Sequence, residues 1–331
     1  MELADVKSGM VFSDLHALVA HKTTGTTKAG QAYADITLRA GSVTLKCKKW
    51  SYKPEKYDEI ITPGKVIKVA GKADLYNGEL QGTINEIEAS DRPLAEFVQR
   101  SRFSTDLLYT KMLDVANAFE DPMLKYVTTL LLSQYKEEFC RSPAALGMHH
   151  AWYGGLVEHT YNMLALAMRI TKLYQEQYGA KYFSRDLVLC GVILHDIGKI
   201  FEYDSSIPGA FKMKPEGVLA NHLVRGPILV HDASTDWYTV IKDTSLSPTQ
   251  EQFERNRDLL VHLIASHHGS HEFGSAALPS CLEAVLLHQI DMIDSQFMQA
   301  FELVEGKAGE VAGFSERAKV GNRVQFLQKS V

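Results

Sequence analysis

Apolar and polar residues alternate along the first ninety residues, which is the pattern of half-buried β-strands. Gly30, Gly41, Pro63–Gly64 and Asn77–Gly78 punctuate this stretch, and an Asn-Gly pair between two strand-like runs is a strong hairpin signal. The runs occupy residues 15–23, 32–40, 42–50, 65–76 and 79–89. Five short strands in such a stretch predict a small closed barrel.

From Pro93 onward the apolar residues recur three and four positions apart, which is the spacing of amphipathic helices. The pattern predicts helices over residues 105–119, 122–139, 156–178, 186–195, 216–231, 251–268 and 279–304. A chain of 331 residues has room for two domains, and the period changes near residues 90–92. We expect an all-β barrel at 1–90, a helical connector at 91–140, an all-α bundle at 141–305 and a polar tail at 306–331.

The overall charge does not point to a nucleic-acid partner, because the net charge is −5 and the isoelectric point is near 6.2. One stretch departs from this average, since residues 22–53 carry seven basic side chains and a single acid, Asp35. A basic stretch in an acidic protein is typical of a phosphate-binding surface. A solvated strand face explains the same charge without any ligand.

The cysteines and the apolar runs bear on where the protein works. Four cysteines lie far apart without a CxxC pair, which fits neither a zinc knuckle nor a disulfide framework and favours a reducing compartment. The first ten residues lack the apolar core of a signal peptide, and no apolar run approaches the length of a membrane span. We therefore expect a cytoplasmic protein with no membrane partner, and the sequence leaves a homo-oligomer open.

Histidine is concentrated in the helical half, where eleven of the 13 histidines lie between residues 149 and 288. Several of them, with two aspartates, lie at helix ends or on apolar helix faces, where a carboxylate must be paired or bound to a metal. They are His159, His195, Asp196, His222, His267, His268 and Asp291. Imidazole and carboxylate together suit borderline divalent metals such as Mn, Fe, Co, Ni or Zn.

Four of the candidates form two adjacent pairs, His195–Asp196 and His267–His268. The side chains of neighbouring residues on a helix point about 100° apart. Both members of a pair can therefore act as metal ligands more easily if the helix frays there or if two metals are bound. Gly198 and Gly269 follow the pairs at positions where helices are expected to end. Two metals about 3.5–4 Å apart, bridged by a carboxylate, would use both members.

Each candidate also has a structural explanation. A single histidine on an apolar face is more often a hydrogen-bonded core residue than a ligand, which applies to His159 and His222. His195–Asp196 fits a buried hydrogen-bonded pair, and His267–His268 fits a surface helix end. Asp291 fits a residue that caps a helix or pairs with a lysine. If no metal is bound, every one of these structural explanations must be true at the same time.

The order H…HD…H…HH…D on consecutive helices resembles the HD superfamily of metal-dependent phosphohydrolases. Four strings, HHAWYGGLVEHT (149–160), GVILHDIGK (191–199), SHHG (266–269) and LHQID (287–291), resemble one branch more closely, the YhaM-type 3′-5′ exoribonucleases. These enzymes place an OB-fold ahead of an HD domain, and the run at 27–50 is weaker support for that half. The resemblance covers nearly the whole chain apart from the tail.

The resemblance implies a site for two divalent ions, with Mn²⁺ as the first expectation. His159, His195, Asp196 and Asp291 would hold one ion. His222, His267 and His268 would hold the other, and Asp196 would bridge them. Lys199 would face the substrate phosphate, although a solvated lysine at a helix end explains it as well. Gly155 stands where some relatives carry an acid, so a third metal is not expected.

Further candidates are residues expected to bind the substrate. His149 and His150 precede the first ligand helix and are candidates for substrate contact, with a structural role at the helix start as the alternative. OB-folds bind single strands with basic grooves and aromatic platforms, although each aromatic alone is more often packing. The candidates in the barrel are Lys22, Arg39, Lys46 and Lys48 for phosphates, and Tyr33, Trp50 and Tyr76 for stacking.

The favoured function is a metal-dependent 3′-5′ exonuclease that hydrolyses single-stranded RNA, with single-stranded DNA as a second substrate, to nucleoside monophosphates by metal-activated hydroxide. One alternative is an HD phosphohydrolase for small nucleotides or cyclic dinucleotides, with the barrel as a regulatory or binding module. Two others are a nucleic-acid-binding protein with a structural metal and a protein whose histidines only pack. The complete ligand set argues against the last two, and the basic stretch favours the first.

Overall fold

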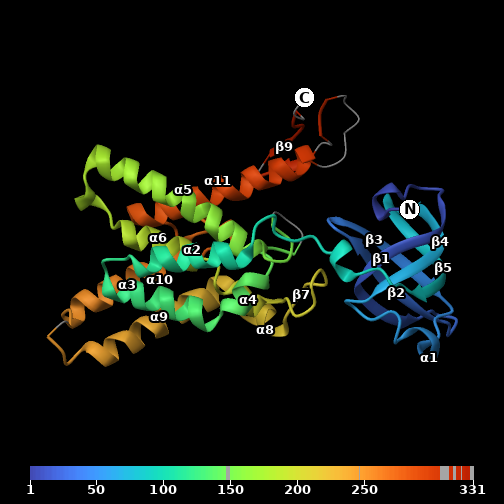
Figure 1. The fold of residues 1–331 in the computed structure, drawn as a ribbon, viewed down its shortest axis with the longest axis horizontal. Coiled ribbons are helices and arrows are strands. Elements are labelled where there is room, and N and C mark those ends of the chain that lie inside the picture. Colours follow the sequence, from blue (N-terminus) through green and yellow to red (C-terminus); the bar gives the residue numbers. More distant parts are fainter. Residues whose placement is uncertain (147–149, 246, 306–312, 316–317, 322, 329–331) are drawn as a thin grey trace. The chain divides into compact units, whose positions relative to one another are not determined.

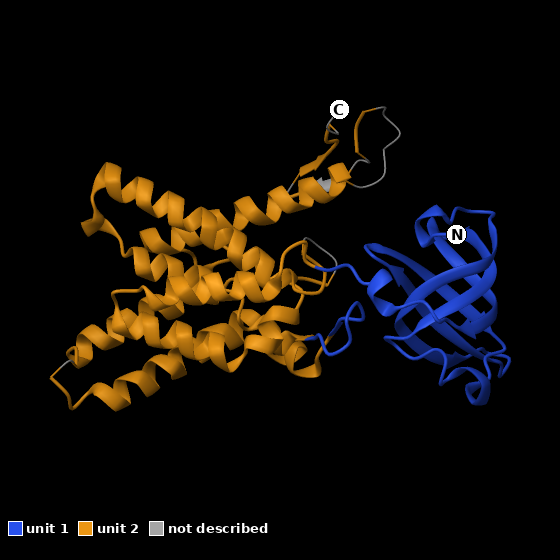
Figure 2. Cartoon of the chain, viewed as in Figure 1, with its two compact units in different colours: residues 1–100, 204–212 blue, residues 101–203, 213–331 orange. Residues whose placement is uncertain are grey.

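The computed structural model describes residues 1–146, 150–245, 247–305, 313–315, 318–321 and 323–328. The chain forms two compact units, coloured separately in Figure 2. One unit comprises residues 1–100 together with residues 204–212, and the other comprises residues 101–203 and 213–331. The second stretch of the first unit therefore comes from a loop that leaves the helical part of the sequence and returns to it.

The first unit is a closed five-stranded barrel (Figure 1). Its strands are β1 (Val11–Thr26), β2 (Ala32–Ala40), β3 (Val43–Trp50), β4 (Val66–Tyr76) and β5 (Glu79–Ala89). They close in the order β1-β2-β3-β5-β4, and only the β3–β5 pair is parallel. This is the strand order of an OB-fold, so the predicted barrel is confirmed. Short helices lie at Leu3–Asp5, Pro54–Tyr57 (α1) and Leu94–Glu96.

The alternation of the strands accounts for the barrel core. Leu15, Ile36, Leu38, Ile67 and Ile84 point inward and are at most 2% exposed. The predicted hairpin is present, since Asn77 and Gly78 both have positive φ (52° and 81°), as a type I′ turn requires. Barrel closure depends on Gly82, where a Cβ would lie 2.6 Å from the Cys47 Sγ of the neighbouring strand.

The second unit is all-α apart from short strand pairs. Its longest helices are α5 (Gly155–Tyr178), α9 (His222–Ile241), α10 (Gln250–Ser266) and α11 (Leu282–Glu305). Helix α6 (Arg185–Leu194) lies at the centre because residues 187–194 are all buried, and it packs against α3, α5, α10 and α11. The remaining elements are α2 (Thr105–Asn117), α3 (Pro122–Gln134), α4 (Lys136–Arg141), α7 (Lys199–Glu202), α8 (Pro215–Leu219), β6 (Tyr203–Asp204), β7 (Lys212–Met213), β8 (Ala318–Val320) and β9 (Arg323–Gln325).

Most predicted helices are present within a few residues, but two predictions are wrong in detail. The segment 122–139 is two helices, α3 and α4, because the backbone at Tyr135 leaves the helical region (φ −117°, ψ 24°). The segment 216–231 is also divided, since Asn221 is extended and α9 begins at His222. Helix α9 then continues through Pro227 to Ile241, ten residues beyond the predicted end.

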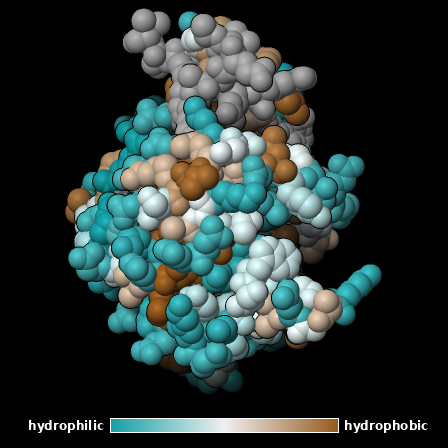
Figure 3. Space-filling view, turned by 90° about the vertical axis from the view of Figure 1, so that its right-hand side faces the viewer, coloured by the Kyte–Doolittle hydropathy of each residue, from teal (hydrophilic) through white to brown (hydrophobic). Residues whose placement is uncertain are grey.

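The surface turned to the viewer in Figure 3 is largely hydrophilic, with its apolar side chains in small separate groups. Exposed large apolar side chains of the barrel include Trp50, Leu75 and Tyr76. In the described part of the chain, no helix is both long enough and apolar enough to cross a bilayer.

Candidate metal centre

The ends and faces of five helices bring all seven metal-ligand candidates together. His159 lies on α5, His222 is the first residue of α9 and Asp291 lies on α11. His195–Asp196 follow the last residue of α6, and His267–His268 follow the last residue of α10. Residues more than 130 positions apart in the sequence thus contribute to one cluster.

Asp196 is at the centre of the cluster, and its two carboxylate oxygens face different imidazoles. Its Oδ2 lies 3.2 Å from Nε2 of His195 and 3.9 Å from Nε2 of His159. Its Oδ1 lies 3.6 Å from Nε2 of His267 and 3.7 Å from Nε2 of His222. This is the arrangement that a carboxylate needs in order to bridge two ions.

The remaining two candidates extend the cluster on either side. The Nε2 atoms of His268 and His222 are 3.3 Å apart, and Asp291 Oδ1 lies 3.4 Å from His159 Nε2. The ligand atoms of His222, His267 and His268 all lie within 4.8 Å of one another, and so do those of His159, His195 and Asp196. A further such group, His195, His267 and Asp291, joins the two halves.

The Nδ1 atoms of three imidazoles are held by backbone carbonyls. His195 Nδ1 donates to Val192 O (2.8 Å), and His267 Nδ1 donates to Ile264 O (2.6 Å). These carbonyls belong to the last turns of α6 and α10, where helices leave acceptors unsatisfied. His268 Nδ1 donates to Phe273 O (2.7 Å). Because a carbonyl only accepts, each Nδ1 carries a proton, and in the neutral form of each ring Nε2 presents a lone pair.

The chain brings both members of each adjacent pair inward because the helices end there. Helix α6 ends at Leu194, so Asp196 lies in a turn instead of on a helix face. A Cβ at Gly198 would lie 2.7 Å from the backbone of His222, so glycine permits this close approach. Gly269 has a positive φ of 78°, and a Cβ there would meet the His288 ring at 2.2 Å.

Two buried carboxylates hold the other imidazoles, and the sequence analysis gave neither of them a role. His159 Nδ1 donates to Asp294 Oδ2 at 2.7 Å, and His222 Nδ1 donates to Glu202 Oε2 at 2.6 Å. Carboxylates of this kind orient ligand imidazoles and make them more basic. A signal for Asp294 existed, because residues three apart on a helix share a face and Asp291 was already a candidate. Glu202 had no comparable signal.

The electrostatics favour the forms that bind metals. Burial alone would raise the pKa of Asp196, but Lys199 and His195 hold it well below its usual range. The Lys199 Nζ is 2.6 Å from Asp196 Oδ2. Burial lowers the pKa values of His222, His267 and His268, which favours the neutral ring. Ionised carboxylates and neutral imidazoles are the ligand forms of these side chains.

His159 differs from the other imidazoles. Burial lowers its pKa, but hydrogen bonds and charges from Asp291 and Asp294 outweigh burial and raise the pKa to about 10. The same contacts hold the pKa of Asp291 below its ordinary value against the effect of burial. An ion at His159 Nε2 would therefore take the place of a proton, so its binding would release protons.

The donor atoms also fit an ion because several of them lack any other partner. In the described part of the chain, Asp196 Oδ1, His195 Nε2 and His267 Nε2 are buried and make no hydrogen bond. Each such atom costs about 1–3 kcal/mol if it is left unsatisfied. His267 Nε2 lies 3.6 Å from Asp196 Oδ1, and His195 Nε2 lies 3.2 Å from the other oxygen of Asp196, so divalent ions fit this donor set. The cluster is only partly exposed at His268, Asp291 and Lys199, which mark the side open to solvent.

Three of the nucleic-acid candidates in the barrel form one group. Tyr33 and Trp50 are cross-strand partners on β2 and β3, with ring centroids 5.7 Å apart. The Lys48 Nζ lies 4.4 Å from the Tyr33 ring centroid and 5.0 Å from that of Trp50. Trp50 is 44% exposed, so an aromatic face is available beside a cation.

A hollow of ≈490 Å³ extends this group across the barrel and is lined in part by Lys46, Lys48, Trp50 and Tyr76. The lysines have acidic partners, since Lys48 lies 3.0 Å from Asp35 and Lys46 lies 3.0 Å from Glu79. Tyr76 is 63% exposed at the hairpin between β4 and β5.

The other two cations of the barrel are held elsewhere. Lys22 Nζ pairs with Asp58 Oδ1 at 2.8 Å and is 18% exposed. Arg39 donates to the carbonyl of Gly209 at 3.3 Å, within the loop that returns to the barrel, and is half-buried. The structure therefore does not bring Lys22 and Arg39 into the Tyr33–Trp50 group.

The two histidines ahead of α5 have different outcomes. His149 lies outside the described residues. His150 is fully buried, and its ring faces Asp294 at 3.0 Å.

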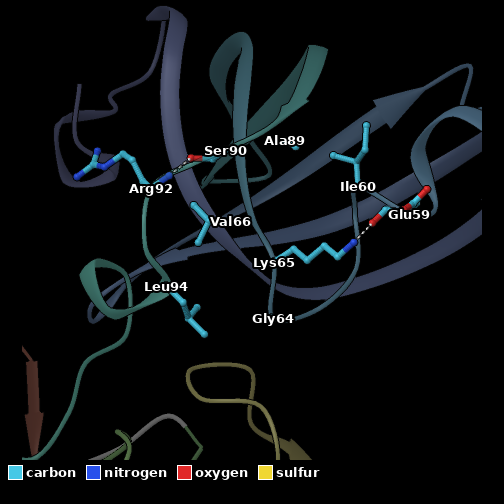
Figure 4. A pocket seen from close by; sticks show the side chains of 9 residues that line it. All are labelled: Glu59, Ile60, Gly64, Lys65, Val66, Ala89, Ser90, Arg92 and Leu94. Carbon is cyan, nitrogen blue, oxygen red and sulfur yellow. Dashed lines mark hydrogen bonds between the residues drawn. The ribbon is translucent and has the colours of Figure 1, made fainter.

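A second hollow on the barrel, of ≈340 Å³, is lined by Glu59, Lys65, Ser90 and Arg92 among others (Figure 4). Its cations are already engaged. Lys65 Nζ donates to the Glu59 carbonyl at 2.7 Å, and the Arg92 guanidinium pairs with Glu96 at 2.6 Å. Since neither charge is directed into the hollow by these contacts, we assign it no ligand.

Comparisons with known proteins match the helical half of the chain to a family model. A family model described as HD domain matches residues 156–296, which contain all seven ligand candidates. The structure of the second OB-fold domain of replication protein A from Methanococcus maripaludis matches 28% of this chain and 98% of its own length, with 15% identity and a TM-score of 0.23. The OB domain of Ta0387 from Thermoplasma acidophilum matches 28% of this chain and 88% of its own length, with 10% identity and the same TM-score of 0.23.

Two curated relatives are similar over most of the chain. The 3′-5′ exoribonuclease YhaM of Oceanobacillus iheyensis is 30% identical over 302 residues, which is 88% of each protein. That of Geobacillus sp. (strain WCH70) is 29% identical over 309 residues, covering 92% of this chain and 88% of the relative. The resemblance read from the motifs is thereby confirmed, and the chain belongs to the YhaM family of 3′-5′ exoribonucleases, with an HD domain that follows an OB-fold.

Proposed function

We propose that this protein is a metal-dependent 3′-5′ exonuclease that degrades single-stranded RNA, and single-stranded DNA as a second substrate, to nucleoside monophosphates. The observation that carries the proposal is the convergence of five imidazoles and two carboxylates around Asp196 in a member of this family. Such a centre suits a hydrolytic phosphodiesterase, because phosphate diesters resist attack at neutral pH without activation of water.

The proposed ligands divide between two ions. His159, His195, Asp196 and Asp291 would hold the first ion, while His222, His267 and His268 would hold the second, and Asp196 would be shared between them. Mn²⁺ is the first choice, with Fe, Co, Ni or Zn as alternatives, and when bound such ions would supply a water molecule of lowered pKa and positive charge for the phosphoryl oxygens. The chain contributes preformed positions for the donor atoms, because backbone carbonyls and buried carboxylates fix the rings.

Lys199 is the proposed cation for the substrate phosphate. Its ammonium group lies beside Asp196, and its side chain is 12% exposed, on the open side of the centre. The attraction between this ammonium group and a bound phosphate would become stronger as negative charge develops in the transition state. Lys199 and Asp196 are the residues to which we assign catalysis.

The OB-fold is the part proposed to bind the nucleic-acid strand. Tyr33 and Trp50 would stack on bases, and Lys46 and Lys48 would exchange their acidic partners for backbone phosphates. Binding at residues 1–90 and hydrolysis at residues 141–305 would then be separate tasks, with 91–140 as the connector. Four free thiols agree with the cytoplasmic location that we propose.

The test compares oligonucleotides labelled at the 3′ end with the same oligonucleotides labelled at the 5′ end, in Mn²⁺ and in excess chelator. The proposal expects the 3′ label to appear at once as mononucleotide and the 5′ label to shorten stepwise, with no activity in chelator. Metal content should be two ions per chain. Turnover of free nucleotides or cyclic dinucleotides alone would instead establish a small-nucleotide phosphohydrolase with a regulatory barrel.

A further inference from the structure

A second buried network lies behind the metal centre, on the side of His159 that faces away from Asp196. His150 is 0% exposed, and its Nε2 lies 3.0 Å from Asp294 Oδ2. The same oxygen lies 2.7 Å from Nδ1 of His159. One carboxylate oxygen therefore contacts two imidazoles, only one of which belongs to the proposed ligand set.

We propose that His150 and Asp294 are positioning residues for His159: Asp294 fixes the ring of the ligand, and His150 fixes Asp294. The inference rests on the proposed metal-dependent function. It assigns His150 to a buried support and not to substrate contact. The described hydrogen bonds connect His150 to His159 through Asp294, so the effect of His150 on metal binding should depend on that carboxylate.

The backbone at His150 is held in an uncommon conformation. Its φ is +54°, in the left-handed region that a few per cent of non-glycine residues adopt, asparagine, aspartate and histidine more often than the rest. The surroundings hold it there, since Ala144 N donates to His150 O at 3.1 Å and a Cβ on Gly155 would lie 2.0 Å from that same oxygen. Strained backbone of this kind persists where the surrounding structure over-determines it, often at functional sites.

The His150 ring also packs against two other rings, those of Trp152 and His159. The Trp152 ring centroid lies 5.0 Å from it, and Trp152 Nε1 donates to the buried Glu158 at 2.9 Å. The His159 ring centroid lies 5.4 Å away on another side. A histidine packed between an anchored indole and a ligand imidazole has little freedom to move its Nε2 away from Asp294.

The hydrogen bonds form a chain that ends on the ligand. Asp294 Oδ2 lies within hydrogen-bond distance of both His150 Nε2 and His159 Nδ1, and a carboxylate oxygen accepts from both rings. With its Nδ1 donating to Asp294, His159 has its Nε2 left to present to a metal.

A third ion among His150, His159 and Asp294 is the alternative, because their ligand atoms also lie within 4.8 Å of one another. Two features favour hydrogen bonds. The distances of 2.7 Å and 3.0 Å are those of charge-assisted N–H···O bonds. A third ion would also require His159 to bind metals through both nitrogens while its Nε2 faces Asp291 at 3.4 Å.

The experiment measures Mn²⁺ binding to the full-length protein without substrate, by calorimetry and by bound-metal content. The variants are Asp294→Asn, His150→Leu, His150→Gln and the double variant Asp294→Asn/His150→Leu. We expect about 10–100-fold weaker binding of one ion in Asp294→Asn, the usual effect of losing such a support. His150→Leu should weaken it less, and His150→Gln, which keeps a donor, should recover part of the loss.

The double variant provides the sharpest result. It should bind Mn²⁺ no more weakly than Asp294→Asn alone, because His150 acts through that carboxylate. If His150 is merely structural, His150→Leu should lower the melting temperature and leave the Mn²⁺ affinity unchanged. If the two residues act independently, the losses of affinity in the single variants should add in the double variant. Either result overturns the inference. His262→Gln is the control, since the His262 ring accepts a hydrogen bond from Ser280 N outside this network.

The outcomes also separate this inference from the proposed function. If the wild-type protein does not bind Mn²⁺ or another divalent ion, the proposed function itself fails. If the wild type binds two ions and all variants bind them equally well, only the positioning role fails. Three ions in the wild type and two in Asp294→Asn would replace the hydrogen-bond network by a third metal site.

Discussion

The metal centre and the Tyr33–Trp50 face hold their polar groups in opposite ways. In the centre, every imidazole is buried or nearly so, and backbone carbonyls or buried carboxylates fix its Nδ1. On the barrel, Lys46 and Lys48 pair with exposed acids across neighbouring strands. The imidazoles of the centre are therefore held by buried hydrogen bonds, whereas the barrel cations are held only by exposed ion pairs.

The difference fits what each region is proposed to bind. Metal ions and a reacting phosphate need donor atoms at fixed positions, because small misplacements cost large factors in rate. A strand of variable sequence needs aromatic faces and mobile charges that tolerate every base. Surface ion pairs contribute only about 0–1 kcal/mol, so a phosphate can displace the acids at little cost. Substitutions in the two regions should therefore differ in both size and kind.

The largest effect is expected for Asp196→Asn, which keeps the shape of the side chain but removes its negative charge. Both carboxylate oxygens face imidazoles, so the loss should affect both ions at once. We expect kcat/KM on an oligonucleotide to fall by more than about a hundredfold, beyond the range for losing an outer support. Metal content should fall together with activity.

Asp232→Asn is the matched control for this change, because Asp232 is a helical aspartate with 68% side-chain exposure. It should keep full activity and full metal content. If Asp196→Asn retained two ions and normal turnover, the metal centre would not be the active site. The proposed division of tasks between the two regions would then be wrong.

A smaller effect is expected for Glu202→Gln. Glu202 accepts from both Nδ1 and the backbone N–H of His222, at 2.6 Å and 2.8 Å. An uncharged amide supports the ring less strongly, so the affinity for one ion should fall by about 10–100-fold. Titration of the metal-free protein with Mn²⁺, read as recovered activity, measures this, and saturating Mn²⁺ should restore most of the rate. An unchanged Mn²⁺ requirement would mean that the ring is held by packing alone.

The fold was predictable because both periodicities are strong and local. Strand alternation and Asn77–Gly78 defined the barrel, and apolar spacing defined most helices. The exceptions are places where local pattern and backbone conflict. Apolar spacing continues across Asn221, where the chain is extended, and Pro227 is tolerated within α9. Residues 204–212 join the barrel unit through tertiary contacts that no local pattern records.

The site was only partly predictable. The seven ligand candidates came from a motif with known spacing, but the roles of Glu202 and Asp294 depend on contacts 20 and 135 residues apart in the sequence. The same limit applies to the barrel. Nothing near Lys22 or Arg39 in the sequence shows that their partners are Asp58 and the carbonyl of Gly209.

On the barrel, Trp50→Ala should weaken strand binding without changing the chemistry. Losing one stacked base costs about 1–3 kcal/mol, which corresponds to about 5–150-fold in affinity. The side chain is 44% exposed, so its removal should leave the fold intact. Fluorescence anisotropy on a labelled oligonucleotide in chelator measures binding, and a small chromogenic phosphodiester in Mn²⁺ measures hydrolysis. If both readouts fell equally, binding and hydrolysis would not be divided between the two regions.

The smallest effect, and the most direct test of exchangeable charges, is expected at Lys46. Each phosphate contact on a single strand contributes about 0.7 to the slope of log affinity against log salt concentration. Lys46→Ala should reduce the slope by about that amount, with a modest loss of affinity at low salt.

Glu79→Ala is the matched change, because it removes the partner that lies 3.0 Å from the Lys46 ammonium. If the lysine exchanges Glu79 for a phosphate, removing the acid should strengthen strand binding, since the strand no longer competes with it. The slope should stay the same, because the number of phosphate contacts does not change. Weaker binding in Glu79→Ala would instead mean that this ion pair holds Lys46 in place, so that the barrel face is preorganised in the same way as the metal centre.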